Sequence, residues 1–154
     1  MSAPSINDYL TEDHDRLDGL LETFQDWRAK DSARAKDFLT QFTVGLQRHL
    51  RWEESILFPL FEQKTGHSGL TNTLRGEHEE IREWLAALNQ KVEQNDADCD
   101  HEEKMLVEKL GGHNAREEYA LYPELDKLLT EEEQKAAFEA MAAVPEGNSQ
   151  ERTG

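Results

Sequence analysis

HLRWEESILFP, residues 49–59, returns 64 residues later as HNAREEYALYP, residues 113–123. Both copies read His-x-x-x-Glu-Glu-x-x-Leu-aromatic-Pro. On a helix, residues i and i+4 stack on one face, with Cβ atoms roughly 6 Å apart. Each copy therefore directs one imidazole and one carboxylate the same way, from His49 with Glu53 and from His113 with Glu117. This spacing is typical of a pair of metal ligands, and the chain presents it twice.

The 64-residue offset extends beyond these two segments. His14 and His78 are also 64 residues apart, and each precedes its His-x-x-x-Glu partner by 35 residues. Apolar positions match under the same shift: Leu10 with Leu74, Leu17 with Ile81, Leu21 with Leu85, and Phe24 with Leu88. The repeat predicts a duplicated helical hairpin whose copies pack around a pseudo-twofold axis. It selects four of the six histidines, because His67 and His101 have no counterpart.

The composition restricts the class of protein. The 154-residue chain can bury a core without disulfides, and we expect one domain over residues 1–144 and a disordered polar tail over residues 145–154. A net charge of −16 argues against nucleic acid and anionic membranes as partners, because both require a basic face. The lone Cys99, together with the lack of a signal peptide or of an apolar run of ~20 residues, predicts a cytoplasmic protein. We expect a monomer or a weak homo-oligomer.

Apolar residues recur at helical spacing along most of the chain. These stripes run from Ile6 to Trp27, from Ala35 to Leu60, from about Thr71 to Gln94, and from Met105 to Leu121. A capping-box pattern at residues 130–133 opens a short further helix to about Ala143. No segment has a convincing strand pattern. The predicted fold class is all-α, an antiparallel up-down four-helix bundle with a short C-terminal fifth helix.

Proline and glycine interrupt two of the predicted helices. Pro59 is expected to kink or loosen the end of the second helix, because proline removes one backbone donor. Pro123 is expected to end the fourth. The Gly111-Gly112 pair weakens the fourth helix by about 1 kcal/mol per glycine relative to alanine, or it allows a neighbouring helix to approach closely. The sequence leaves both interpretations open.

The histidines on the apolar stripes point to a metal site. In a four-helix bundle, inward-facing side chains from four helices meet at one level of the core. Burying four histidines and two carboxylates there without partners would cost several kcal/mol per charge. Metal binding removes that cost, because imidazole and carboxylate are natural ligands for iron, manganese or zinc. A single core histidine is usually only hydrogen-bonded, but four that obey one repeat favour metal binding.

The chelate spacing distinguishes between types of bundle. Ferritin-like di-iron bundles use Glu-x-x-His, which is absent here. Over about residues 5–125 the chain instead resembles the hemerythrin family, specifically its bacterial hemerythrin-like proteins with a His…His-x-x-x-Glu…His…His-x-x-x-Glu signature. The resemblance implies two iron ions in a non-haem centre that is bridged by two carboxylates and an oxo or hydroxo group. The implied metal ligands are His14, His49, Glu53, His78, His113 and Glu117, with Glu53 and Glu117 as the bridges.

One position departs from the family's oxygen carriers, which have a further histidine one turn before the third-helix histidine. Here that position is Leu74, which cannot bind a metal. The resemblance therefore implies open coordination, which favours binding of or reaction with oxygen, nitric oxide or peroxide over reversible oxygen carriage. Two alternatives stay open: a protein that stores or senses iron without catalysis, and a structural zinc bundle. The second is weaker, because structural zinc is normally closed at four ligands.

Other polar residues receive weaker expectations. Asp18, one turn after His14, is expected to be an extra ligand, to support a ligand, or to lie at the surface. Glu54 and Glu118 point about 100° away from the proposed bridges, so they are expected to be solvated or to support the ligands. His67 and His101 are expected at the surface. Cys99 is expected to be inert, and the aromatic residues Trp52, Trp84 and Phe58 are expected to form core or pocket wall.

Overall fold

The computed structural model describes residues 4–145. Its elements in chain order are α1 (Ile6–Arg28), α2 (Ser32–Trp52), η1 (Glu53–Leu57), α3 (Phe58–Thr65), α4 (Gly69–Glu93), α5 (Asp100–Arg116), η2 (Glu117–Leu121), α6 (Tyr122–Leu128) and α7 (Glu131–Ala142). The π-helical turns η1 and η2 join α2 to α3 and α5 to α6, so each of these runs is one long helix. Residues 4–145 thus form four long helices and a short fifth, without a strand. The predicted all-α fold is confirmed.

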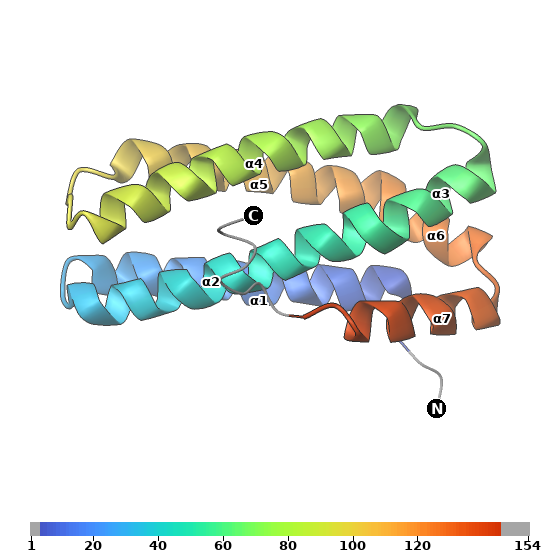
Figure 1. Cartoon of the computed structure of the whole chain (residues 1–154), viewed down its shortest axis with the longest axis horizontal. Helices are drawn as coiled ribbons and strands as arrows, with labels where there is room; N and C mark the ends of the chain where they lie inside the picture. Colours follow the sequence, from blue (N-terminus) through green and yellow to red (C-terminus); the bar gives the residue numbers. More distant parts are fainter. Residues whose placement is uncertain (1–3, 146–154) are drawn as a thin grey trace.

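The four long helices form an antiparallel bundle (Figure 1). Helix α1 packs along α2 and α4 packs along α5, so each half of the chain supplies one hairpin. Contacts of α1 with α6 and of α2 with α4 join the two hairpins. Helix α7, red in Figure 1, covers one end of the bundle, where the Trp52 indole Nε1 donates a hydrogen bond to the Met141 carbonyl oxygen at 3.0 Å. This is the bundle that the 64-residue repeat predicts.

Side-chain caps fix the starts of three helices. The Ser5 hydroxyl accepts a hydrogen bond from the Asp8 N–H at 3.0 Å, and the Asp31 carboxylate accepts one from the Arg34 N–H at 3.1 Å at the start of α2. Thr130 and Glu133 form the predicted capping box at the start of α7. Each cap satisfies backbone donors that have no partner within the helix, which typically contributes about 1 kcal/mol.

The π-helical turns begin at the two motif glutamates. In η1 the Phe58 N–H donates to the Glu53 carbonyl oxygen, five residues earlier. In η2 the Tyr122 N–H donates in the same way to Glu117. A π turn holds residue i+5 close to the helix face of residue i, which an α-helix does not do. Each turn therefore brings the aromatic residue of the repeated motif to the same side as its glutamate.

These turns also explain how the helices continue past their prolines. Pro59 and Pro123 supply no backbone N–H, and their rings need room near the preceding turn. The wider π turn provides that room. The helix continues past Pro59 to Thr65, and the kink or loosening expected there stays a prediction. The prediction that Pro123 ends the fourth helix is wrong, because α6 continues to Leu128.

The interior consists of two apolar cores with a polar layer between them. One core contains Leu17, Phe24 and Leu88, and the other contains Leu10 and Leu125. On α1, His14 lies between Leu10 of one core and Leu17 of the other, and all three side chains are buried. The fold therefore places the polar layer near the middle of the bundle, away from both ends.

Two expectations concern regions that the structure describes in part or not at all. The predicted disordered tail, residues 145–154, lies outside the described residues except for Pro145, and the domain boundary at residue 144 stays a prediction. Within residues 4–145, no helix combines the length and the low polarity that crossing a membrane would require.

The structure decides between the two interpretations of Gly111-Gly112. A Cβ atom built at either glycine meets nothing within 4 Å, so no neighbouring helix makes use of the missing side chains. At Gly45, by contrast, a Cβ would lie 2.8 Å from Leu17 Cδ2 in the core. The Gly111-Gly112 pair thus only weakens α5.

We therefore expect Gly111→Ala and Gly112→Ala each to raise the free energy of unfolding by about 0.5–1 kcal/mol, because alanine loses less backbone entropy in a helix. Urea unfolding followed by circular dichroism measures this change. Gly45→Ala is the matched control and should not stabilise, because its methyl group would displace Leu17. Equal stabilisation at all three positions would contradict the packing described for Gly45.

Candidate metal centre

The polar layer contains all six residues that the sequence nominated. The four histidines and the two glutamates are all buried. They form two groups that share both glutamates. The first group is His14, His49, Glu53 and Glu117, and the second is His78, His113, Glu53 and Glu117. Within each group, one potential ligand atom from every residue lies within 4.8 Å of the others, so side chains from four helices converge on two adjoining positions.

Glu53 presents one carboxylate oxygen to each group. Its Oε2 lies 3.3 Å from His49 Nε2 in the first group. Its Oε1 lies 3.0 Å from His78 Nε2 and 3.9 Å from His113 Nε2 in the second. The carboxylate thus spans the two positions.

Glu117 spans them in the same way. Its Oε1 lies 3.3 Å from His14 Nε2, and its Oε2 lies 2.9 Å from His113 Nε2 and 3.6 Å from His78 Nε2. The buried Oε2 forms an ion pair with His113 but has no hydrogen-bond partner. A buried carboxylate oxygen without a donor is costly in a protein interior, and a cation held between the imidazoles would supply its partner.

A second carboxylate orients each imidazole. The Nδ1 atoms lie 2.7 Å from Glu118 in His14, 2.8 Å from Asp13 in His49, 2.7 Å from Glu54 in His78 and 2.9 Å from Glu77 in His113. A carboxylate accepts a hydrogen bond from Nδ1–H, which leaves Nε2 directed into the group. Glu54 and Glu118 therefore support the histidines, which is one of the two roles that the sequence analysis expected for them. Asp13 and Glu77 were missed, although each directly precedes a histidine of the repeat.

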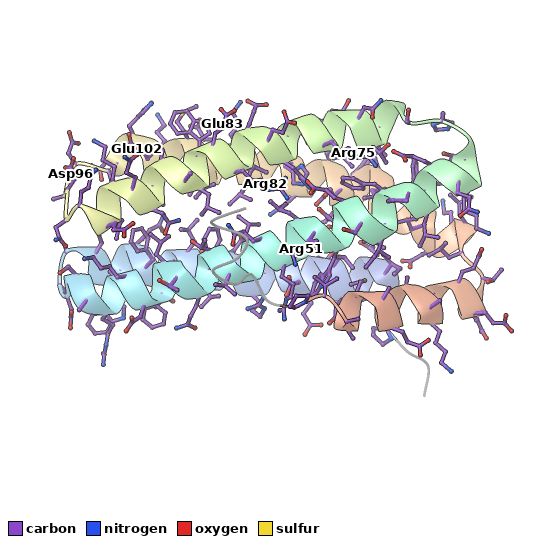
Figure 2. All side chains as sticks on the ribbon, viewed as in Figure 1. Arg51, Arg75, Arg82, Glu83, Asp96 and Glu102 are labelled. Atoms are coloured by element: carbon purple, nitrogen blue, oxygen red, sulfur yellow. The ribbon has the colours of Figure 1, made fainter. Side chains whose placement is uncertain are left out.

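Arginines hold some of these carboxylates in turn. Arg82, labelled on α4 in Figure 2, donates from both terminal nitrogens to the Glu54 carboxylate at 2.8 Å. Burial alone would raise the pKa of Glu54, but His78 and Arg82 outweigh it and lower that pKa to about 2. The carboxylate therefore stays ionised. Arg116 makes a similar 3.0 Å ion pair with Glu77.

The surrounding carboxylates change the acid strength of the histidines. Burial alone would lower the pKa of each imidazole, but the carboxylates outweigh it and raise the pKa to about 9 in His49, about 11 in His78 and about 10 in His113. In the metal-free protein at neutral pH, these imidazoles therefore carry protons that balance the two buried glutamates. A metal cation provides the same positive charge.

The contacts between ring nitrogens fit a metal site. His78 Nε2 and His113 Nε2 lie only 3.1 Å apart, while the Nδ1 atom of each ring is already engaged with a carboxylate. In the neutral form that binds a metal, the two imidazoles point their Nε2 lone pairs at each other and at the carboxylate oxygens. A cation between them removes that repulsion, and nitrogen and oxygen donors suit iron, manganese and zinc. The buried cluster therefore fits a metal-binding site.

Tyr122 is a further polar residue of the cluster, and sequence reasoning missed it. Its hydroxyl donates to Glu53 Oε2 and lies 2.9 Å from Glu117 Oε1. The same oxygen lies 3.2 Å from His14 Nε2 and 3.3 Å from His49 Nε2. Burial and the two glutamates raise the pKa of Tyr122 well above its ordinary value, so the metal-free protein keeps the phenol proton. The sequence feature that could have identified Tyr122 is its hydroxyl group, which the aromatic residue of the first motif copy, Phe58, does not have.

The remaining candidates lie outside the cluster. Asp18, His67 and His101 are exposed, and none of them belongs to either group. Trp52 is buried in one of the apolar cores, and Trp84 packs against the other. The two unrepeated histidines therefore lie at the surface, as expected.

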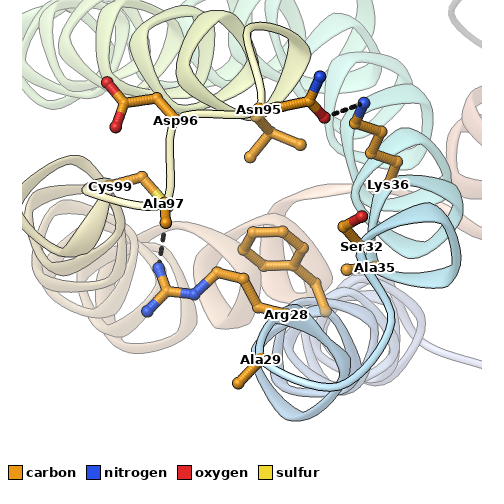
Figure 3. Close-up of a pocket in the computed structure, with 11 residues that line it drawn as sticks. Arg28, Ala29, Ser32, Ala35, Lys36, Asn95, Asp96, Ala97 and Cys99 are labelled. Carbon is orange, nitrogen blue, oxygen red and sulfur yellow. Dashed lines mark hydrogen bonds between the residues drawn. The ribbon is translucent and has the colours of Figure 1, made fainter.

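Cys99 lies at the far end of the bundle from α7, beside a hollow of about 310 Å³ between the α1–α2 and α4–α5 connections (Figure 3). Its thiol is buried and accepts a hydrogen bond from Arg28 Nη1 at 2.9 Å. Burial raises the pKa of Cys99, which disfavours the reactive thiolate. None of the six cluster residues lines this hollow, so the hollow and the metal cluster are separate features.

Comparison with known proteins agrees with this geometry. The family model of the hemerythrin HHE cation binding domain matches residues 5–125. An uncharacterised hemerythrin-like protein of Schizosaccharomyces pombe is 31% identical over 130 residues, which cover 83% of this chain but 63% of that protein; the match thus spans less than two thirds of that relative. No solved structure matches significantly. The matched region covers most of the chain and contains every residue of the buried cluster. The chain therefore belongs to the hemerythrin HHE cation-binding domain family.

Proposed function

We propose that this protein is a non-haem di-iron protein that binds or reacts with oxygen, nitric oxide or peroxide in the cytoplasm. The proposed ligands are His14 and His49 on one iron, His78 and His113 on the other, and Glu53 and Glu117 between them. The observation that carries the proposal is the way each glutamate spans the two groups, with one oxygen toward each pair of histidines. That arrangement suits two metal ions that share bridging carboxylates, with an oxo or hydroxo group completing the bridge.

The donor set favours iron over structural zinc. A structural zinc ion is normally closed by four protein ligands, usually including cysteine. Neither group contains a cysteine, and each shares both of its carboxylates with the other. Histidine and carboxylate ligands that leave coordination positions open are typical of non-haem iron sites that bind small molecules. Iron would supply redox chemistry and an affinity for diatomic ligands.

The protein's own residues set the conditions around the proposed iron. The four Nδ1 carboxylates hold the imidazoles with Nε2 inward, which increases the basicity of the ligands. The apolar cores on either side limit the access of water, so charges in the layer interact strongly. Leu74, fully buried one turn before His78, adds no donor to the second group. A small uncharged molecule such as oxygen or nitric oxide suits such an interior.

The proposed di-iron centre predicts the metal content of the protein. Protein purified aerobically should contain about two iron ions per chain, because each group offers four protein donors. His49→Ala and His113→Ala each remove one imidazole from a different group, so each variant should retain about one iron or less. Metal analysis by mass spectrometry measures this. His101→Ala, at an exposed position outside both groups, is the control and should keep the iron content of the original protein. A loss of iron in this control, or zinc as the main metal, would contradict the proposal.

Iron binding should also release protons. The raised pKa values of His49, His78 and His113 keep these rings protonated at neutral pH, whereas metal binding requires neutral imidazoles. Affinity should therefore rise as pH increases from 6 toward 9 and fall in acid. Anaerobic calorimetric titration of metal-free protein with ferrous iron, in two buffers of different ionisation enthalpy, counts the protons released. Identical heats in both buffers would rule out this coupling.

A further prediction concerns small molecules. The reduced protein should bind nitric oxide with a change in its absorption spectrum, and in air it should oxidise rather than carry oxygen reversibly. Leu74→His would place an imidazole on the same face as His78 and should slow the oxidation at least several-fold. Stopped-flow absorption under controlled oxygen measures both rates. Reversible oxygenation of the unmodified protein would favour an oxygen carrier instead.

A further inference from the structure

The Tyr122 hydroxyl lies against all four residues of the first group. It contacts both imidazoles of that group and one oxygen of each shared glutamate. The phenol has one proton, and it donates that proton to a glutamate. If His14 and His49 are neutral ligands with Nδ1–H bound to carboxylates, their Nε2 lone pairs and the phenol oxygen all point at one region. With one oxygen from each of the two glutamates, five donor atoms converge on this region, and such a convergence is typical of a cation site.

The second group has no such oxygen. Phe58 is the repeat counterpart of Tyr122, and both residues directly follow a π turn. The two rings also lie similarly: the ring centroids are 5.6 Å apart for Tyr122 and His14 and 5.3 Å apart for Phe58 and His78. The halves of the protein therefore present an aromatic ring to each group, but a hydroxyl to only one of them.

We propose that Tyr122 binds the metal of the first group through its phenol oxygen, as a seventh protein ligand, and that Phe58 leaves the second metal without an equivalent ligand. This inference rests on the proposed di-iron centre. In the binding step the phenol O–H bond breaks, the proton leaves to solvent and an oxygen–iron bond forms, without a change in oxidation state. Tyrosinate is an established iron ligand, as in catalase.

The ligand makes the two iron positions inequivalent. On an octahedral count, two imidazoles, two bridging carboxylate oxygens, the oxo or hydroxo bridge and the phenolate fill the first iron. The second iron would have the same set of ligands without the phenolate, because Phe58 stands where Tyr122 stands in the other half, and one of its coordination positions would stay open. Nitric oxide, oxygen or peroxide would therefore bind to the iron held by His78 and His113.

The absorption spectrum tests the assignment directly. Ferric iron bound to phenolate gives a charge-transfer band in the visible region, and excitation in that band enhances phenolate ring vibrations in the Raman spectrum. The aerobically purified protein should show both signals, and Tyr122→Phe should lose both while keeping about two iron ions per chain. Phenylalanine should pack at this position, because the other half of the repeat has Phe58 there. Tyr119→Phe is the matched control, since Tyr119 is 88% exposed and should leave both signals unchanged.

The outcomes separate this inference from the proposed function. About two iron ions per chain without phenolate signals in the unmodified protein would overturn the role of Tyr122 and leave the di-iron centre intact. Phenolate signals that survive in Tyr122→Phe would overturn it as well. Protein without iron would overturn the proposed function itself. The Raman measurement on the unmodified protein needs no variant, so the inference stays testable even if Tyr122→Phe does not fold.

Discussion

Burial of four imidazoles and two carboxylates at one level of the bundle is the constraint on which the rest of the structure depends. Each buried ion lacking partners would cost several kcal/mol, a large part of the 5–15 kcal/mol that typically stabilises a domain. The structure offsets this cost in layers. Glu53 and Glu117 face the imidazoles from inside, a second set of carboxylates binds each Nδ1 atom, and arginines such as Arg82 bind some of those carboxylates at the surface. Charge alternates in sign from the centre outward, which stabilises every member of the network.

The two π turns connect this electrostatic network to the backbone. They begin at Glu53 and Glu117 and end two residues before the motif prolines. A regular α-helix would turn the aromatic residue at i+5 away from its glutamate, whereas the π turn brings the Tyr122 hydroxyl to 2.9 Å from Glu117 Oε1. The same backbone irregularity thus accommodates a proline and adds a side chain to the cluster. The apolar cores on both sides hold these helices in place.

The repeat gives the site approximate symmetry, and individual substitutions break that symmetry. The Nδ1 carboxylates obey it: Glu54 of the first half supports His78 of the second, and Glu118 supports His14 in return. The surface partners of these carboxylates do not obey the repeat. Arg82 pairs with Glu54, but the repeat counterpart of Arg82 is Asp18, which is an acid and cannot pair with a carboxylate in this way. Tyr122 and Phe58 differ by one hydroxyl. A duplicated scaffold can therefore hold two similar metal positions and still assign them different chemistry.

The sequence by itself determined the bundle, its approximate helix boundaries and the six residues of the buried cluster, because i, i+4 spacing and apolar periodicity are local properties of a helix. The repeat also separated these histidines from His67 and His101, which the structure places at the surface. Only the tertiary structure decided which carboxylate binds each Nδ1 atom, as in the contact of His14 with Glu118 across 104 residues. Likewise, only the tertiary structure placed the Tyr122 hydroxyl among four cluster residues, and it did so through a π turn that local propensity does not predict. Contacts between helices depend on how the helices pack and rotate against one another, and no local sequence pattern encodes that geometry.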